Sequence, residues 1–519
     1  MVSGCSGGFP AAAKRKVSNV AKPVAKLVRS FGHARLSSEA LCDVRYSVLA
    51  ASIFTMSMVG CGGNENKSQP APPTAKPTTS ISVPETFAPI PDVRTPSGEE
   101  TESGRPTQDT RVYRRTDDRV VQNLERLTGS QIKRYESRRM ILYSDVAPEI
   151  AEQLPPLVDA LYTELVRFFG ELPANKEGTD FQATGYLMRD QRQFRTLGLI
   201  TDRVPAFQNG RHIGYEFWAN DQQDDYYRRH LVLHEFTHCF MACVTGTNDA
   251  PPAWYMEGMA EYFGTHRLTS NGPQFGVMPE NKKDYKGLGR ITHLNQAKLQ
   301  GDVRSLNDVM SLRAEDGTLY QWSWALCWFL TNQSDLEFDG IGTHHTLNSF
   351  QRKLADVVQR DANMLEARWR DFVNQLCDGY DGRRAAVEMK AGVDLKIGES
   401  KTVSIAADRN WQSTGIAIDS TGRYVVTASG RYQVDNQPKP WISEPNGVSI
   451  WYAKGERLGC LLAAVYSAKD KDSLVKTIRI GEGNTITDRE GTLYLRINDT
   501  MSSLANNAGS VEVTIRREQ

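Results

Sequence analysis

The sequence has no excess of charge of either sign and no long hydrophobic run. Lys plus Arg and Asp plus Glu both number 62 among 519 residues, whereas a protein that coats nucleic acid needs a basic surplus. No apolar run reaches the roughly 18–20 residues of an uninterrupted membrane span. We therefore expect no nucleic-acid partner, and we do not expect a polytopic membrane protein.

Cysteine is also scarce and scattered. The eight cysteines form no CxxC pair, which argues against a thiolate zinc knuckle and against a disulfide-rich scaffold. A disulfide from Cys243 to Cys327 or to Cys377 is compatible with the pattern, and the sequence does not choose between these pairings. Hydrophobic residues make up 39% of the chain, which is enough to form real cores in two or three domains of roughly 100–200 residues each.

Residues 1–61 predict an export signal. A basic segment precedes the apolar stretch 46–60, and Val59-Gly60-Cys61-Gly62 ends that stretch. The pattern resembles a bacterial lipoprotein signal, in which the cysteine becomes the lipidated first residue of the mature chain. The resemblance implies a lipid anchor at Cys61 and export to the bacterial cell envelope. The alternatives are a plain signal peptide and a short uncleaved anchor. Residues 62–114 carry nine prolines and predict a disordered tether between anchor and globular region.

Strand-like and helix-like segments alternate between residues 115 and 390, which predicts an α+β domain. The sequence favours strands at 140–144, 183–188 and 213–219, and helices at 148–170, 225–244 and within 346–378. The segment 213–219 fits either an ordinary internal strand or an edge strand that is open to backbone pairing.

The helix predicted at 225–244 contains the motif His234-Glu235-Phe236-Thr237-His238. Because four residues make just over one helical turn, the two imidazoles project from the same face. Neutral imidazole is a good zinc ligand, and the glutamate beside it can face a metal-activated water. The motif therefore predicts a zinc site with a general base.

A second helical segment supplies the third ligand. Eighteen residues separate His238 from Glu257, which stands in Ala253-Trp254-Tyr255-Met256-Glu257-Gly258-Met259-Ala260-Glu261-Tyr262. A helix–turn–helix of that length can fold back and aim Glu257 at the two histidines. Two imidazoles and one carboxylate leave a coordination position open, as a catalytic zinc site requires.

The HExxH-x18-E spacing and the W-x-x-E-G-x-A-E-Y segment resemble the gluzincin metallopeptidases, in particular the aminopeptidase N branch. The resemblance implies an α+β thermolysin-like domain over residues 115–390 that hydrolyses peptide bonds in a peptide or protein substrate. It assigns His234, His238 and Glu257 to zinc, Glu235 to general base and proton shuttle, and Glu261 to a hydrogen bond with the first histidine. The exopeptidase's GxMEN segment is absent from this sequence, so aminopeptidase activity is not implied.

Tyr320 lies 63 residues after Glu257, about where aminopeptidase N-like enzymes have a tyrosine that stabilises the transition state. The resemblance therefore makes Tyr320 a candidate catalytic residue. The alternative is a core position, because Trp324 and Trp328 follow it at helical spacing.

Residues 391–519 predict an all-β sandwich. Seven short segments of strand-like residues are separated by Gly, Asp and Asn turns, a density of short strands that is typical of such a fold. The predicted strands are 402–405, 424–428, 448–452, 461–466, 477–480, 492–497 and 510–515.

The loop 498–510 contains carboxylate and amide oxygens between two apolar strands, and calcium prefers such ligands. Its Asn-Asp start, Asn-Asn-x-Gly-Ser end and length resemble the LecA-like calcium-dependent galactose-binding lectins. The resemblance assigns the side chains of Asp499, Asn506 and Asn507 and the carbonyl of Ser503 to Ca²⁺, with a further carbonyl near Val434. Ser443 and Asn446 stand where those lectins have a sugar-contacting His and Gln, and a metal-free sandwich with an Asn-rich turn is the alternative.

The sequence as a whole predicts an exported, membrane-anchored zinc metallopeptidase with an appended sandwich that binds calcium and glycan or cell-envelope polysaccharide. One competing hypothesis is a carbohydrate-binding surface lipoprotein whose peptidase-like domain is inactive. The other is a structural envelope protein in which both metal sites only stabilise the fold. The intact Glu235 favours an active peptidase over an inactive one, because catalysis needs a base at that position.

Overall fold

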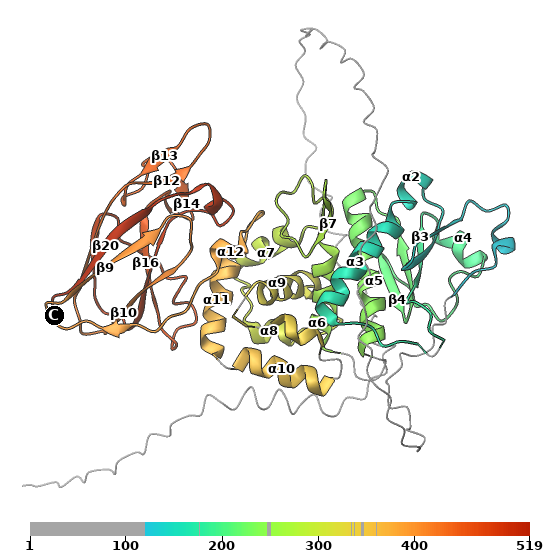
Figure 1. Ribbon diagram of the computed structural model, residues 1–519, viewed down its shortest axis with the longest axis horizontal. Coiled ribbons are helices and arrows are strands. Elements are labelled where there is room, and N and C mark those ends of the chain that lie inside the picture. The colour runs from blue at the N-terminus through green and yellow to red at the C-terminus, as the bar shows by residue number, and fades with distance from the viewer. Residues whose placement is uncertain are drawn as a thin grey trace, which may run out of the picture. The chain divides into compact units, whose positions relative to one another are not determined.

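The computed structural model (Figure 1) describes residues 120–175, 177–245, 251–333, 335–336, 338–343, 347–359 and 361–519. The predicted export signal at 1–61 and the predicted tether at 62–114 lie outside these residues. Helices and several β-sheets make up the described part, as the sequence predicts. None of the helices described is both long and apolar enough to cross a bilayer.

The first half of the described chain is built on a five-stranded mixed sheet with the order β1-β2-β3-β5-β4. Strands β2, β3 and β5 are parallel, and β1 and β4 run antiparallel to them at the two edges. Strands β2 and β3 are buried throughout, which explains their continuous apolar sequence. The bounds are β1 Lys133–Glu136, β2 Met140–Ser144, β3 Ala183–Met188, β4 Gly210–Ile213 and β5 Glu216–Asn220.

The prediction of a single strand at 213–219 is wrong. Gly214 has a φ of +58°, and Ile213 pairs with Glu216 across a two-residue turn, so the chain reverses there. The internal strand β5 pairs with β3 and β4. The edge strand on this side of the sheet is therefore β4, which the sequence did not predict.

Helices cover this sheet and extend away from it (Figure 1). The helix predicted at 148–170 is two helices, because Pro155 stands in the first turn of the second and favours a new start there. Helix α5 packs on β3, β5 and β4, and α6 packs between α5 and α9. The helices are α2 Pro148–Ala151, α3 Leu154–Phe169, α4 Gln191–Thr196, α5 Asp225–Thr245, α6 Ala253–Gly264, α7 Arg290–Leu299, α8 Leu306–Met310, α9 Leu319–Thr331, α10 Leu347–Gln359, α11 Ala362–Gln375 and α12 Gly382–Ala385.

The rest of the described chain forms two larger sheets that face each other. Their orders are β17-β16-β19-β10-β8 and β18-β11-β20-β9, and one hydrophobic core draws on both sheets, which makes a β-sandwich. The bounds are β8 Val393–Asp394, β9 Ser400–Ala406, β10 Gln412–Ile418, β11 Tyr424–Ser429, β16 Leu461–Tyr466, β17 Ile478–Arg479, β18 Gly483–Ile486, β19 Gly491–Ile497 and β20 Ser510–Arg517.

Small hairpins complete the structure. They are β6 His266–Thr269 with β7 Gly272–Phe275, β12 Tyr432–Asp435 with β13 Trp441–Ser443, and β14 Tyr452–Ala453 with β15 Glu456–Arg457. The predicted strand 448–452 is wrong for all but its last residue. Ile450 and Trp451 are exposed there, so their apolar character does not reflect a core position.

Candidate metal centre

Helix α5 brings His234 and His238 together on one face, as their spacing predicts. Both side chains are buried, and their Nε2 atoms lie 3.1 Å apart. The Nδ1 atom of His238 has no hydrogen-bond partner, whereas Nδ1 of His234 faces a carboxylate oxygen of Glu261. Two Nε2 lone pairs this close require a proton or a cation between them.

Helix α6 adds Glu257 to this pair. Its Oε2 atom lies 3.3 Å from Nε2 of His238 and 3.4 Å from Nε2 of His234, and the three ligand atoms lie within 4.8 Å of one another. Gly258 allows α6 to approach α9 closely, because a Cβ there would lie 2.6 Å from the Ser323 carbonyl oxygen. Gly258 therefore permits the short spacing between α9 and α6, the helix that carries Glu257.

The donor set fits a catalytic zinc ion. Two neutral imidazoles and one carboxylate are the ligands that such sites use, and they leave a position open. Burial alone would lower the pKa of His234, but hydrogen bonds with Glu257 and Glu261 raise it to about 10. The pocket therefore favours positive charge between these side chains, and a divalent cation would supply it.

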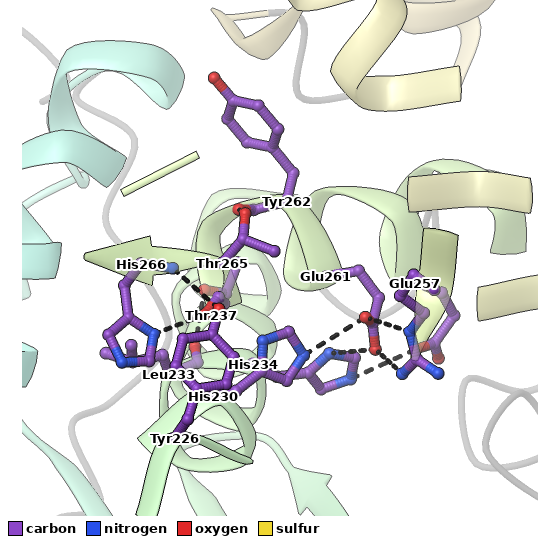
Figure 2. A network of polar contacts seen from close by, with 12 residues as sticks. Tyr226, His230, Leu233, His234, Thr237, Glu257, Glu261, Tyr262, Thr265 and His266 are labelled. Carbon is purple, nitrogen blue, oxygen red and sulfur yellow. Dashed lines mark hydrogen bonds and ion pairs between the residues drawn. The ribbon is translucent and has the colours of Figure 1, made fainter. Parts of the chain in front are cut away.

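Glu261 lies beside Nδ1 of His234, the side on which the resemblance implies a hydrogen bond. Its Oε1 atom lies 3.4 Å from Nδ1 of His234, and its Oε2 atom lies 3.3 Å from Nε2 of His230. Arg290 donates two hydrogen bonds to the carboxylate, at 2.7 and 2.8 Å. Figure 2 shows His230, His234 and Glu261 linked in one network. Burial would raise the pKa of Glu261, but Arg290 and His230 outweigh it and hold the pKa well below its usual range.

Two groups of side chains that share His234 could hold a metal, and this network distinguishes between them. His230, His234 and Glu261 also bring their ligand atoms within 4.8 Å of one another. In that group, however, the carboxylate is already neutralised by Arg290 through two hydrogen bonds. A cation gains less there, so His234, His238 and Glu257 are the better candidate metal site. Glu261 is placed where it could orient His234.

Glu235 stands beside the metal ligands on the side of the edge strand. It is 5% exposed, and burial raises its pKa to about 7. A Cβ on Gly210 of β4 would lie 2.3 Å from its Oε1 atom. The carboxylate therefore occupies space that only a glycine in the edge strand leaves open.

His212 is a site residue that the sequence did not predict. It lies on β4, its ring stacks on the ring of His238 at 4.5 Å, and its Nδ1 atom lies 3.9 Å from Oε2 of Glu235. The available signal was the two-residue spacing from Gly210, which places both on one face of a strand. That signal could be used only once β4 was recognised.

Tyr320 lies near His234 at the candidate metal centre. It is the second residue of α9, its ring centroid is 6.1 Å from that of His234, and the Arg290 guanidinium lies 5.6 Å from the ring. The structure thus brings Tyr320 to the rim of the site, whereas Trp324 is fully buried. Trp324 is therefore a core residue, and the catalytic role of Tyr320 stays a prediction.

The sandwich holds a second group of polar atoms in the loop between β19 and β20. The atoms Oδ2 of Asp499 and Oδ1 of Asn498, Asn506 and Asn507 are buried without a hydrogen-bond partner. Burial raises the pKa of Asp499 to about 6. Buried oxygens without donors are costly, and oxygens of these types are what Ca²⁺ binds.

Asp435, the last residue of β12, lies beside this loop and was not predicted from the sequence. Its Oδ1 atom accepts a hydrogen bond from Nδ2 of Asn506 at 3.0 Å, and its charge contributes to the raised pKa of Asp499. The carbonyl of Ser503, predicted as a ligand, accepts from the Asn506 amide at 3.0 Å. Asp435 is thus a second carboxylate beside the three predicted side chains.

The positions compared with sugar contacts are used within the protein. Ser443 is buried and donates to the Glu444 carbonyl at 3.1 Å, and Asn446 accepts from the Glu482 amide at 3.2 Å.

The cysteines in the described part of the chain, Cys239, Cys243, Cys327, Cys377 and Cys460, are free thiols. The two disulfide pairings that the sequence allowed, Cys243 with Cys327 and Cys243 with Cys377, are therefore not formed.

Comparison with known proteins adds little. No family model matches the chain, and no curated protein matches it. The chain is similar to a solved structure described as "EclA N-terminal domain; PllA-like lectin", with 19% identity and a TM-score of 0.18. The match covers 22% of this chain and 95% of that one. A likeness this distant carries no argument about function.

Proposed function

We propose that this chain is an exported zinc metallopeptidase, a hydrolase with a thermolysin-like α+β domain. The observation that carries the proposal is the convergence of Nε2 of His234, Nε2 of His238 and an oxygen of Glu257 within 4.8 Å. Glu235 adjoins these ligands, and an edge strand borders the base. This arrangement supports hydrolysis rather than a purely structural metal site, because a structural zinc needs no buried base.

Zinc bound by the three ligands would polarise the scissile carbonyl and lower the pKa of a water molecule. Glu235 accepts the proton of that water on its carboxylate and returns it to the leaving amine. Tyr320 is proposed to donate its phenolic proton in a hydrogen bond to the carbonyl oxygen as negative charge develops there. Strand β4 is proposed to bind the substrate by backbone pairing, because its outer edge faces no other strand in the described sheet.

The proposal extends to location and partners. A lipid anchor at Cys61 and the tether 62–114 would hold the peptidase at a membrane surface of the bacterial cell envelope. The sandwich is proposed to bind Ca²⁺ through Asp499, Asn506 and Asn507, with glycan or cell-envelope polysaccharide as its partner. The buried, unpartnered oxygens of this loop support the calcium assignment.

The test is cleavage of a random peptide library by the zinc-loaded full chain. We expect cleavage that a chelator abolishes and added zinc restores. Glu235→Gln should lose about 10²–10⁴-fold in rate while it keeps its metal, because the base does not bind zinc in this scheme. Glu149→Gln, a change at an exposed glutamate, serves as the matched control. A folded, zinc-loaded protein that cleaves nothing would contradict the proposal and favour the carbohydrate-binding alternative.

A further inference from the structure

Strand β4 presents two residues to helix α5. Side chains alternate along a strand, so Gly210 and His212 share one face while Arg211 and Ile213 share the other. Ile213 packs against the core on the far side of the sheet. Gly210 and His212 face α5, where Glu235 and His238 stand three residues apart, about one helical turn.

The two contacts between β4 and α5 are complementary. The missing side chain of Gly210 makes room for Oε1 of Glu235. Nδ1 of His212 lies 3.9 Å from the other carboxylate oxygen, Oε2. The His212 ring lies nearly parallel to that of His238, with an interplanar angle of 16°. The face of the His212 ring is therefore packed on the ring of His238, and its Nδ1 edge is turned toward Glu235.

We propose that His212 is a positioning residue for Glu235. The ring is held by stacking on His238. Its Nδ1 atom confines Oε2 of the carboxylate, while Gly210 leaves room for Oε1. Its catalytic consequence rests on the proposed peptidase function, because orienting a base matters only where the base transfers a proton. The substrate would lie along the same strand, so β4 both binds the peptide and orients the base.

Side-chain geometry makes the proposal specific to one atom. The amide nitrogen of asparagine is a δ atom and can stand near the place of Nδ1, whereas phenylalanine keeps a flat ring against His238 but has no polar atom. His212→Asn therefore tests the polar contact, and His212→Phe tests the stacking alone. His293→Phe, at an exposed histidine on α7, is the matched control.

The experiment measures the affinity of acetohydroxamic acid for the zinc-loaded full chain by calorimetry, since a hydroxamic acid shares its hydroxyl proton with the neighbouring carboxylate. We expect His212→Phe and Glu235→Gln each to weaken binding about tenfold, or about 1.4 kcal/mol. The double variant should be no weaker than Glu235→Gln alone, because residues that act through one group are not additive. His212→Asn should recover most of the loss. Zinc affinity, measured by chelator competition, should stay unchanged throughout.

Three results would overturn the proposal: His212→Phe binding as tightly as the unmodified chain, His212→Asn binding as weakly as His212→Phe, or additive losses in the double variant. Failure of the peptidase function gives a different pattern. In that case the unmodified chain would bind the hydroxamate but cleave no peptide, and the coupling between His212 and Glu235 would still be measured. With a peptide substrate, His212→Phe should lower kcat while KM stays near its original value.

Discussion

At the scale of single residues, the sequence predicted which side chains converge wherever their placement depends on local geometry. His234, Glu235 and His238 follow from the helical repeat, and Glu257 follows from one helix folding back on another. His212 and Arg290 could not be predicted, because their contacts depend on a strand and a helix that are distant in sequence. Only tertiary packing brings them to Glu235 and Glu261.

His266 supports a prediction at this scale. It is buried on β6, its Nδ1–H donates to the Gly264 carbonyl at 2.9 Å, and Arg229 donates to its Nε2 atom at 3.1 Å. Burial, with a further contribution from the Arg229 charge, lowers the pKa of His266 to about 3. One ring nitrogen thus donates a hydrogen bond and the other accepts one, which is the pattern of a neutral imidazole.

The pH dependence of stability follows from this shift. An unfolded histidine has a pKa of about 6.5, so between pH 6.5 and 3 the unfolded chain binds more protons at His266 than the folded chain. Stability must therefore fall as the pH falls through this window. From pH 7 to pH 5 the unmodified chain should lose about 2 kcal/mol more in its free energy of unfolding than His266→Gln. Urea unfolding of both proteins at each pH measures this difference, and equal losses would contradict the assignment.

At the scale of elements, apolar periodicity predicted long helices and buried strands well. Strand β3 matches its predicted bounds, and α5 matches to within one residue at its end. The errors fall where a single backbone feature decides the outcome, as at Gly214, whose positive φ separates β4 from β5. Strand β10 was missed, because the polar residues at its start weaken the strand pattern.

The loop between β19 and β20 gives the prediction at this scale. Asp499 is 3% exposed and its Oδ2 atom has no donor, so a bound cation should stabilise the fold. Ca²⁺ at about a hundred times its Kd should raise the free energy of unfolding by about 2.7 kcal/mol, seen as a higher Tm.

Asp499→Asn should abolish this calcium response. Without calcium the variant should be at least as stable as the unmodified chain, because it removes a buried charge whose Oδ2 atom has no donor. Asp394→Asn, at an exposed aspartate on β8, should keep the full response. A Tm that ignores calcium in the unmodified chain would contradict the site, and the same shift in Asp499→Asn would place the calcium elsewhere.

At the scale of the whole molecule, the sandwich and the helices share buried contacts that periodicity could not predict. Met501 and Leu504 of the candidate calcium loop are fully buried in the large core of the first half. Asp371 on α11 accepts hydrogen bonds from Asn410 at 2.8 Å and from Trp411 at 3.2 Å. The boundary near residue 390 stays a prediction, and the two sides of it are joined by a common core.

The central claim for the whole molecule is that α5 and α6 together bind one zinc ion. Its most direct test is the metal content of the purified full chain, measured by mass spectrometry for the unmodified protein, Glu257→Ala and the exposed-site control Glu149→Ala. We expect about one zinc per chain in the unmodified protein and the control, and a loss of bound zinc in Glu257→Ala, since a three-ligand site cannot spare one. Full zinc content in Glu257→Ala, or none in the unmodified chain after loading with zinc, would contradict this account.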